Sequence, residues 1–162
     1  MKIREIRIED NKIIAEIIRS VMATFDADPE TTIIGDPTLD TMYNNYQTPK
    51  ATYYVLEEDG KVVGGCGIKH LDHSDDNICE LQRMFLLPSS RGKGFGKKLM
   101  ELCLDKAREY GYEEIYLETL SQMKTAIGLY KRYGFEISSK PKGNTGHSGC
   151  NVYMILNLNK LN

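Results

Sequence analysis

Apolar and polar residues alternate in some stretches of the chain, and in others the apolar residues recur every three or four positions. Residues 2–8 alternate and residues 52–58 are rich in strand formers, so both stretches are predicted to be strands. Apolar side chains recur every three or four residues over 11–24 and 92–110, which predicts two amphipathic helices. Asp10 stands where the cap of the first helix is expected. The predicted buried faces are Ile13, Ile14, Ile17, Ile18, Val21 and Met22 in the first helix, and Phe95, Leu99, Leu102, Cys103, Ala107 and Tyr110 in the second.

Turn-forming residues divide the rest of the chain. Asp59-Gly60 predicts a two-residue hairpin turn. The strand after that turn contains Gly64, Gly65 and Gly67, which mark places where other parts of the chain approach its backbone closely. The further predicted elements are helices at 38–47 and 123–133 and strands at 61–70, 77–87, 114–119, 134–139 and 150–158.

This order of elements predicts an α/β fold in which helices cover a mixed sheet. The step from strand 77–87 through helix 92–110 to strand 114–119 is expected to be a right-handed crossover between parallel strands. A length of 162 residues fits one domain of ordinary size, so we expect residues 1–162 to form a single domain.

Composition and charge argue against several classes of protein. Hydrophobic residues make up 41% of the chain and charged residues 27%, which is typical of a globular protein. With a net charge of −2, the chain lacks the overall positive field that attracts nucleic acid. It also contains no run of about 18 apolar residues, so no membrane span is expected. The cysteines are widely spaced and the start of the chain does not look like a signal peptide. We therefore expect reduced thiols and a cytoplasmic location.

The segment R91-G-K-G-F-G96 lies between a predicted strand and a predicted helix. Free N–H groups at a helix start attract anions, and glycines let the backbone approach a phosphate closely. Arg91 and Lys93 add positive charge at the same place. A P-loop pattern is absent, and a dinucleotide fingerprint counted from Gly92 would have Lys97 at its third glycine position. Taken alone, the segment fits either an anion site or a flexible turn.

The surrounding residues narrow this choice. The stretch E80-L-Q-R-M-F-L-L-P-S-S-R-G-K-G-F-G-K-K-L99 resembles the central motif of the GNAT superfamily of acetyl-CoA-dependent N-acetyltransferases. In that motif an R/Q-x-x-G-x-G/A turn follows a strand that ends near a proline. A second stretch, A126-I-G-L-Y-K-R-Y-G-F135, is similar to the family's A-x-x-L-Y-x-x-x-G-F helix. The resemblance implies a GNAT-like fold, with a central mostly antiparallel sheet, one parallel splayed strand pair and helices on both faces.

The same resemblance implies how acetyl-CoA would be bound. The amides of the glycine-rich turn would hold the pyrophosphate. The strand before it would carry a bulge that separates it from strand 114–119 and frees its main chain for the pantetheine arm. One departure is Met123, which stands where the family often has an asparagine. The implied cofactor-binding residues are Met84, Phe85, Leu86, Arg91, Gly92, Lys93, Gly94, Phe95, Gly96, Lys97 and Ala126.

Acetyl transfer to an amine needs a base, donors near the carbonyl oxygen and a proton for the departing sulfur. Tyr130 occupies the helix tyrosine position of the family and is the implied proton donor, with plain core packing as the alternative. Glu80 is the candidate general base, because the family often has a glutamate in this strand; a salt bridge is the alternative. A backbone N–H of Met84 or Phe85 would face the oxyanion.

The acceptor is predicted to be a primary amine on a small molecule or a peptide. In the family it enters opposite the cofactor, here beside the acidic segment 26–40 and residues 140–150. Asp72, Asp75 and Asp76 add negative charge, which favours a cationic acceptor, although an ordinary solvated acidic loop would look the same. A protein N-terminus as acceptor, a longer acyl donor and a non-catalytic CoA-binding sensor remain open alternatives. The resemblance also leaves a homodimer open.

Two other groups of residues look chemical but fit poorly. Cys66, His70, His73 and Cys79 lack the spacing of a usual zinc site, so no metal is expected. His147 and Cys150 lack an indicated third partner, so a cysteine nucleophile is not expected.

Overall fold

In the computed structural model of the protein, which describes residues 1–75 and 77–160, all strands belong to one sheet. Their order across the sheet is β1-β2-β3-β4-β5-β7-β6. The β4–β5 pair is parallel and the other neighbouring pairs are antiparallel, which confirms the predicted topology. The strands are β1 Lys2–Glu5, β2 Thr52–Glu58, β3 Lys61–His70, β4 Ile78–Leu86, β5 Glu114–Thr119, β6 Glu136–Ser138 and β7 Val152–Asn157.

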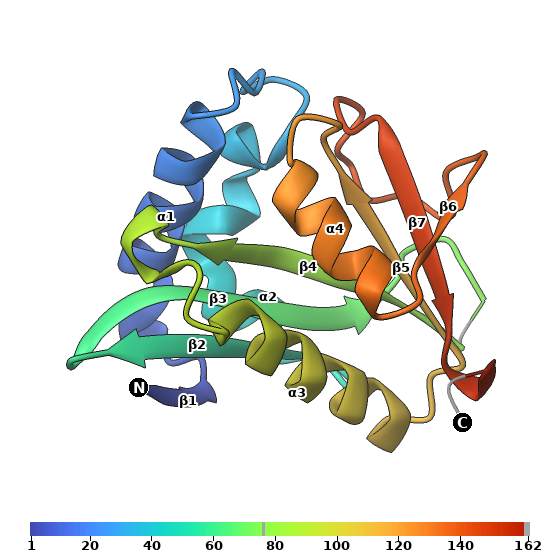
Figure 1. Cartoon of the computed structure of the whole chain (residues 1–162), viewed down its shortest axis with the longest axis horizontal. Coiled ribbons are helices and arrows are strands. Elements are labelled where there is room, and N and C mark those ends of the chain that lie inside the picture. The colour runs from blue at the N-terminus through green and yellow to red at the C-terminus, as the bar shows by residue number, and fades with distance from the viewer. Residues whose placement is uncertain (76, 161–162) are drawn as a thin grey trace.

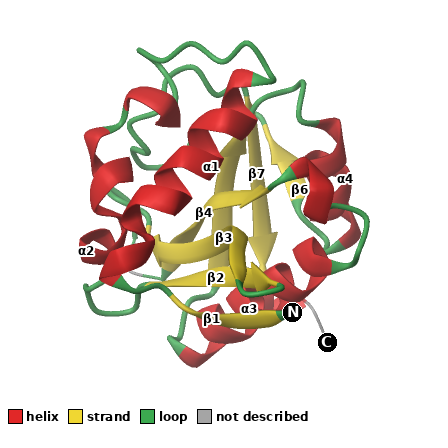
Figure 2. Cartoon of the chain, turned by 90° about the vertical axis from the view of Figure 1, so that its left-hand side faces the viewer, coloured by secondary structure: helices red, strands yellow, loops and turns green. Residues whose placement is uncertain are grey.

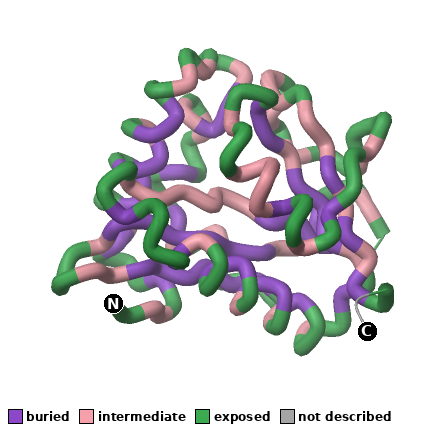
Figure 3. The backbone as a smooth tube through the Cα atoms, in the orientation of Figure 1, coloured by how far each residue is buried: buried purple, intermediate pink, exposed green. Residues whose placement is uncertain are grey.

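Helices cover both faces of the sheet, as Figures 1 and 2 show. Helices α1 and α2 lie on one face, and α3 and α4 lie on the other. Each face has its own apolar cluster, so the purple buried segments of Figure 3 run mainly along the strands and the inner sides of the helices. None of the described helices is long and apolar enough to cross a membrane. The helices are α1 Asn11–Ala23, α2 Met42–Asn45, α3 Phe95–Glu109 and α4 Lys124–Arg132.

The start of the chain differs from the prediction. The strand expected at 2–8 ends at Glu5, and a 3₁₀ turn, Ile8–Asp10, follows. Asp10 does not cap α1 with its side chain. Its carboxylate instead accepts hydrogen bonds from the Arg7 amide at 2.7 Å and from the Arg4 guanidinium at 2.7 and 2.9 Å. The chain turns here because a buried carboxylate binds the residues before the helix, not the helix itself.

The helix expected at 38–47 is also interrupted. A 3₁₀ turn, Pro37–Thr41, precedes the short α2. Asp36 accepts from the Thr38 amide at 2.8 Å, and Asn11 of α1 accepts from the Tyr43 amide at 2.7 Å. A long-range side chain therefore takes an amide that a continuous helix would bond internally, which sequence periodicity does not reveal.

The strands at 52–58, 61–70 and 114–119 have the predicted bounds, and most other boundaries move inward by one to three residues, as is common at frayed ends. The largest change is in α3, which starts at Phe95 and not at residue 92. In α1 the expected core residue Ile13 is exposed at 37%, whereas Ala15 is buried. The apolar face of α1 is thus rotated slightly from the predicted one.

The parallel pair that surrounds the site separates partway along its length. Strands β4 and β5 pair from Ile78 to Glu80 only, and the remaining residues of β4 have no partner in β5. On the other side, β4 has two residues, Arg83 and Met84, opposite the single β3 residue Cys66 between the pairs Gly67–Gln82 and Gly65–Phe85, so β4 carries a one-residue bulge. Arg83 has φ +54°, a left-handed conformation that a non-glycine residue adopts only when its surroundings enforce it. The bulge and the splayed pair are confirmed.

Candidate active site

The glycine-rich turn before α3 presents a row of free backbone donors. Gly92 and Gly94 have φ of +74° and +79°, and Gly94 is the N-cap of α3. The first amide that bonds back into the helix is that of Lys98, to the Gly94 carbonyl at 3.2 Å. Within the described residues, the amides of 92–97 donate to no protein acceptor. A side chain at Gly92 or Gly94 would meet nothing within 4 Å, so both glycines border open space. The turn can therefore accept an anion.

The charged side chains of the turn have partners of their own. Arg91 Nε donates to the Leu86 carbonyl at 3.1 Å, which fixes the turn to the end of β4. Lys93 forms an ion pair with Glu58 of β2 at 2.6 Å, and the Ser90 hydroxyl donates to the same carboxylate at 2.7 Å. Lys97 lies 3.7 Å from Glu101 one helical turn later. Backbone amides are consequently the main anion donors of this turn, and Lys93 would have to leave Glu58 to join them.

The separated part of β4 leads from this turn to a pocket. Phe85 and Leu86 pair with β3 on one side, Met84 lies in the bulge, and none of the three has a strand partner on the β5 side. Their side chains still pack, since Met84 and Leu86 contact one apolar cluster and Phe85 the other. Gly96 lies 3.5 Å, measured from an added Cβ, from both Met84 and Leu129, so a small residue lets α3 begin close to β4 and α4.

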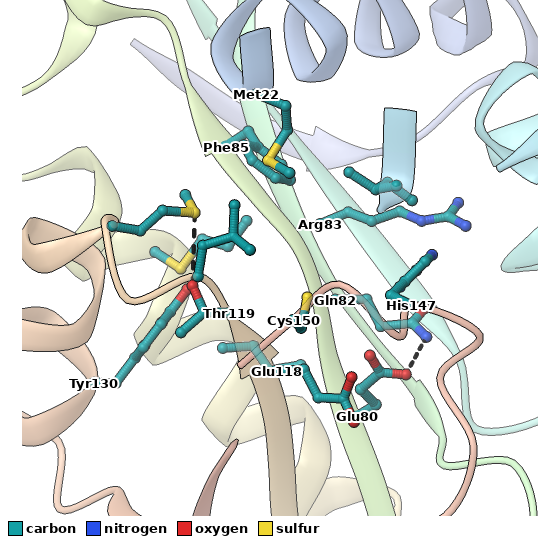
Figure 4. A pocket seen from close by; sticks show the side chains of 15 residues that line it. Met22, Glu80, Gln82, Arg83, Phe85, Glu118, Thr119, Tyr130, His147 and Cys150 are labelled. Carbon is teal, nitrogen blue, oxygen red and sulfur yellow. Dashed lines mark hydrogen bonds between the residues drawn. The ribbon is translucent and has the colours of Figure 1, made fainter. Parts of the chain in front are cut away.

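The pocket opens where β4 and β5 part, with a cavity volume of about 70 Å³. It brings together Glu80, Met84, Phe85 and Tyr130, which the sequence singled out from distant positions. Figure 4 shows side chains from β4, β5, α4 and the loop before β7 converging on it. The lining is Met22, Ile33, Glu80, Leu81, Gln82, Arg83, Met84, Phe85, Glu118, Thr119, Leu120, Met123, Tyr130, His147 and Cys150.

Glu80 is the most perturbed carboxyl group of the pocket. Its residue is 7% exposed, and burial raises its pKa to about 7 from an ordinary 4.5. The Gln82 side chain opposes this by donating to Glu80 Oε2 at 2.6 Å, while the negative charge of Glu118 raises the pKa further. Because Glu80 ionises near neutral pH, it can exchange a proton under ordinary conditions.

A second carboxylate, Glu118 of β5, also lines the pocket. It accepts hydrogen bonds from the Tyr116 hydroxyl at 2.7 Å and from Thr145 at 2.6 Å. Cys150 lies nearby, and burial together with Glu118 and Glu80 raises the pKa of its thiol to about 12. A thiol kept protonated in this way is a poor nucleophile, which agrees with the sequence argument against a cysteine mechanism.

Tyr130 of α4 is buried, with its ring 5.8 Å from that of Phe135. Burial raises the pKa of its phenol, so the proton stays on the oxygen at neutral pH. Among the described residues, none forms a hydrogen bond that shifts the pKa of Tyr130. Every fully buried side-chain nitrogen or oxygen in the described part nevertheless has a hydrogen-bond partner. The hydroxyl is therefore not fully buried, and because Tyr130 lines the pocket we expect it to donate there.

The start of α4 contributes Met123 and Ala126. Met123 lines the pocket, with its sulfur 3.5 Å from the Thr119 hydroxyl, and Ala126 packs against the core. The nearby amide side chain is Asn151, which accepts from the Ser121 amide at 2.9 Å. The thioether of Met123 thus lies at the pocket where the family often has the amide of an asparagine.

The far wall of the pocket is a polar cluster that the sequence did not indicate. Arg83 points from the bulge toward the loop before α2, with its side chain only 9% exposed. It donates to Thr38 at 2.6 Å and to Asp36 at 3.3 Å, and His147 Nε2 lies 3.1 Å from the same Asp36 oxygen. Burial alone would raise the pKa of Asp36, but hydrogen bonds from Thr38 and His147 hold it below its ordinary value.

Asp36 therefore joins the two segments that were expected to border the acceptor. The Gly149 amide adds a second link, donating to the Thr31 carbonyl at 2.8 Å. Of the predicted acidic positions, Asp40 is paired with Arg19, and Asp76 lies outside the described residues. Only the positive φ of Arg83 and its contacts across the fold single it out, and neither is visible in the sequence.

Cys66 and Cys79 are buried in the sheet. Among residues 1–75 and 77–160, no group of three His, Cys, Asp or Glu side chains could share a metal ion.

These features define an acyltransferase of the N-acetyltransferase class, and comparisons with known proteins agree. The model of the acetyltransferase (GNAT) family matches residues 18–135, so the chain belongs to that family. A protein of Escherichia coli (strain K12) described as uncharacterized N-acetyltransferase YjgM is 45% identical over 157 residues, covering 96% of this chain and 93% of that protein.

Solved structures share the fold over almost the whole chain. A GNAT-family acetyltransferase from Staphylococcus aureus Mu50 superposes with a TM-score of 0.84 at 22% identity, over 97% of this chain and 98% of that one. YncA from Salmonella typhimurium, a putative acetyltransferase solved with acetyl-CoA, has a TM-score of 0.79 at 24% identity, over 98% and 94%.

Proposed function

We propose that this chain, acting as a single domain, transfers the acetyl group of acetyl-CoA to a primary amine by direct attack. The observation that carries the proposal is the presence of two sets of free backbone groups near one pocket. They are the amides of 92–97 and the edge of β4 that β5 leaves unpaired, which borders the pocket that contains Glu80 and Tyr130. The family, and the acetyl-CoA bound to YncA from Salmonella typhimurium, support the choice of donor.

The residues present fit such a donor at both ends. The helix start offers several N–H groups to a diphosphate, with Arg91 and Lys97 close by. The free edge of β4 at Met84, Phe85 and Leu86 can pair with an amide-containing arm as an added strand would. When bound, acetyl-CoA supplies an activated acyl group and a sulfur leaving group.

Glu80 is the proposed general base and Tyr130 the proposed general acid. The neutral amine attacks the carbonyl carbon, and Glu80 accepts a proton from its nitrogen, directly or through a water molecule, as the new C–N bond forms. A backbone N–H of Met84 or Phe85 stabilises the negative charge that develops on the carbonyl oxygen. Tyr130 donates its proton to the sulfur as the C–S bond breaks, and solvent then restores both groups.

The acceptor is proposed to be a cationic amine small enough to reach a covered pocket. Two carboxylates, Glu80 and Glu118, line it, and within the described residues neither forms an ion pair. The positive charge of Arg83 is offset by Asp36. An incoming ammonium group is therefore favoured over an anion at the point of attack.

A thiol-release assay with acetyl-CoA and a panel of amines tests the proposal. The panel contains spermidine, glucosamine, a lysine peptide, a free peptide N-terminus and an acidic amino acid, and a parallel series uses a longer acyl-CoA. We expect turnover with acetyl-CoA and preference for a cationic amine, lost in Glu80→Gln. Best turnover with the acidic acceptor would refute the cationic class. Binding of coenzyme A without transfer to any amine would favour a sensor role.

A further inference from the structure

Glu80 belongs to a chain of hydrogen bonds that reaches back through the sheet. The Tyr46 hydroxyl donates to Gln82 Oε1 at 2.9 Å, and Gln82 Nε2 donates to Glu80 Oε2 at 2.6 Å. Figure 4 shows the second of these bonds as a dashed line. Tyr46 is the C-cap of α2 and is absent from the described pocket lining, and its hydroxyl is linked to the site by its hydrogen bond to Gln82.

The fold provides space for this long-range contact. Gly67 of β3 pairs with Gln82 of β4, and a Cβ at Gly67 would come within 3.0 Å of the Tyr46 ring and 2.6 Å of the Thr52 carbonyl oxygen. The absence of a side chain at Gly67 therefore lets the Tyr46 ring cross β3 to reach β4. The ring is fixed there by Tyr53, whose centroid is 5.2 Å away.

A primary amide can present either its oxygen or its N–H groups to a neighbour, and the two faces are nearly equal in shape. Only one orientation lets Gln82 donate to a carboxylate, and in that orientation Gln82 Oε1 faces Tyr46. Burial raises the pKa of Tyr46, so its hydroxyl keeps a proton to donate to that oxygen. The reversed amide would place its oxygen against the carboxylate of Glu80.

We propose that Tyr46 is a positioning residue for Glu80, because its hydroxyl holds the Gln82 amide in the orientation whose N–H group faces the Glu80 carboxylate. This inference rests on the proposed function insofar as Glu80 is the base. Tyr46 thereby stabilises the ionised, proton-accepting form of Glu80 and fixes which of its oxygens remains free for the amine.

Other charged and titratable groups also face Glu80. They are Arg83 on β4, Tyr116 and Glu118 on β5, Asp72 on the turn before β4, and His147 and Cys150 on the loop before β7. Lys69 is its cross-strand partner on β3. None of these groups forms a hydrogen bond with Tyr46, so replacing the Tyr46 hydroxyl changes the Glu80 environment mainly through Gln82.

The test follows the ionisation of Glu80 directly, by NMR of protein labelled with ¹³C at the glutamate carboxyl carbons. The resonance of Glu80 is identified by its loss in Glu80→Gln. We expect Tyr46→Phe to raise the titration midpoint of Glu80 by roughly half to one pH unit, since the freed amide can reverse. Gln82→Leu, which removes the donor, should raise it at least as much, and Tyr46→Phe should add no further shift in that background.

Tyr53→Phe is the matched control. Tyr53 is an equally buried tyrosine of the same cluster, and its hydroxyl donates to the Arg83 carbonyl at 2.9 Å and not to Gln82. An unchanged Glu80 midpoint in Tyr46→Phe, or an equal shift in Tyr53→Phe, would overturn the inference. In turnover assays the acidic limb should move with the NMR midpoint while the KM for acetyl-CoA stays constant. A wild-type protein without acetyl transfer would instead refute the proposed function and leave the NMR result to decide on the role of Tyr46.

Discussion

Replacing Glu80 with glutamine should make the stability of the folded chain less dependent on pH. In the wild type, burial raises the pKa of Glu80 to about 7, whereas the unfolded chain exposes a carboxyl group with the ordinary value of 4.5. A higher pKa in the folded state means that the folded protein binds the proton of Glu80 more tightly than the unfolded chain does. The contribution of Glu80 to stability is therefore fully present below pH 4.5 and is lost as the pH rises through about 7.

The size of the effect follows from the two pKa values. One pKa unit corresponds to about 1.4 kcal/mol, so complete ionisation of Glu80 should cost the folded state about 3 kcal/mol. Glutamine has a similar shape and does not ionise. We therefore consider the free energy of unfolding of Glu80→Gln minus that of the wild type. This difference should rise with pH and level off above neutrality, whatever its value at low pH.

Urea unfolding of both proteins between about pH 4 and about pH 9 measures this difference. Glu136→Gln, at an exposed position of β6, controls for the loss of one carboxylate from the surface. A difference between Glu80→Gln and the wild type that stays constant across this range would refute the reasoning. Glu80 would then be ordinarily solvated, and its assignment as a base that ionises near neutrality would lose its physical basis.

Three further predictions concern other parts of the site. Tyr130→Phe should lower kcat by roughly 10²-fold with little change in the affinity for acetyl-CoA, measured by thiol release and calorimetry; an unchanged kcat would remove its role as general acid. Gly94→Ala should lower the free energy of unfolding by about 1 kcal/mol, because φ is +79° there, and should weaken coenzyme A binding; full retention of both would show that the turn tolerates a side chain. Glu118→Gln removes a negative charge beside Glu80, so the acidic limb of the pH–rate profile should move to lower pH and the KM for a cationic amine should rise; an upward move of the limb would contradict the predicted electrostatics.

Local patterns in the sequence predicted the topology and the regions of the site well. The alternation of β2, the hairpin at Asp59-Gly60 and the glycine-rich turn all depend on residues close in the chain. The parallel pair followed from the strand–helix–strand crossover, and its splaying and bulge from the family resemblance, whereas the order of the strands across the sheet was not predicted. Predictions failed where a distant side chain intervened, as when Asn11 accepted the Tyr43 amide and divided the expected helix.

The polar surroundings of the pocket were harder to predict for the same reason. Arg83 looked like an ordinary strand residue, but the bulge turns it toward Asp36, which is 47 positions earlier in the chain. Glu118 looked like one charge of a short strand, yet it lies near Glu80 because β4 and β5 pair as far as Glu80 and Tyr116, two residues before Glu118. Such contacts depend on the register of the sheet, and no local pattern records them.

The glycines of β3 connect the fold to the proposed chemistry. In the sequence they predicted that other parts of the chain approach the backbone of β3 closely. In the structure, tyrosine rings make this close approach at two of the glycines. A Cβ at Gly65 would lie 2.5 Å from the Tyr53 ring, and one at Gly67 would lie 3.0 Å from the Tyr46 ring. Tyr53 then binds the bulge at the Arg83 carbonyl, while Tyr46 binds Gln82. Because both rings cross a strand that is absent from the described pocket lining, we expect β3 to influence the bulge and the Glu80 carboxylate through these two tyrosines.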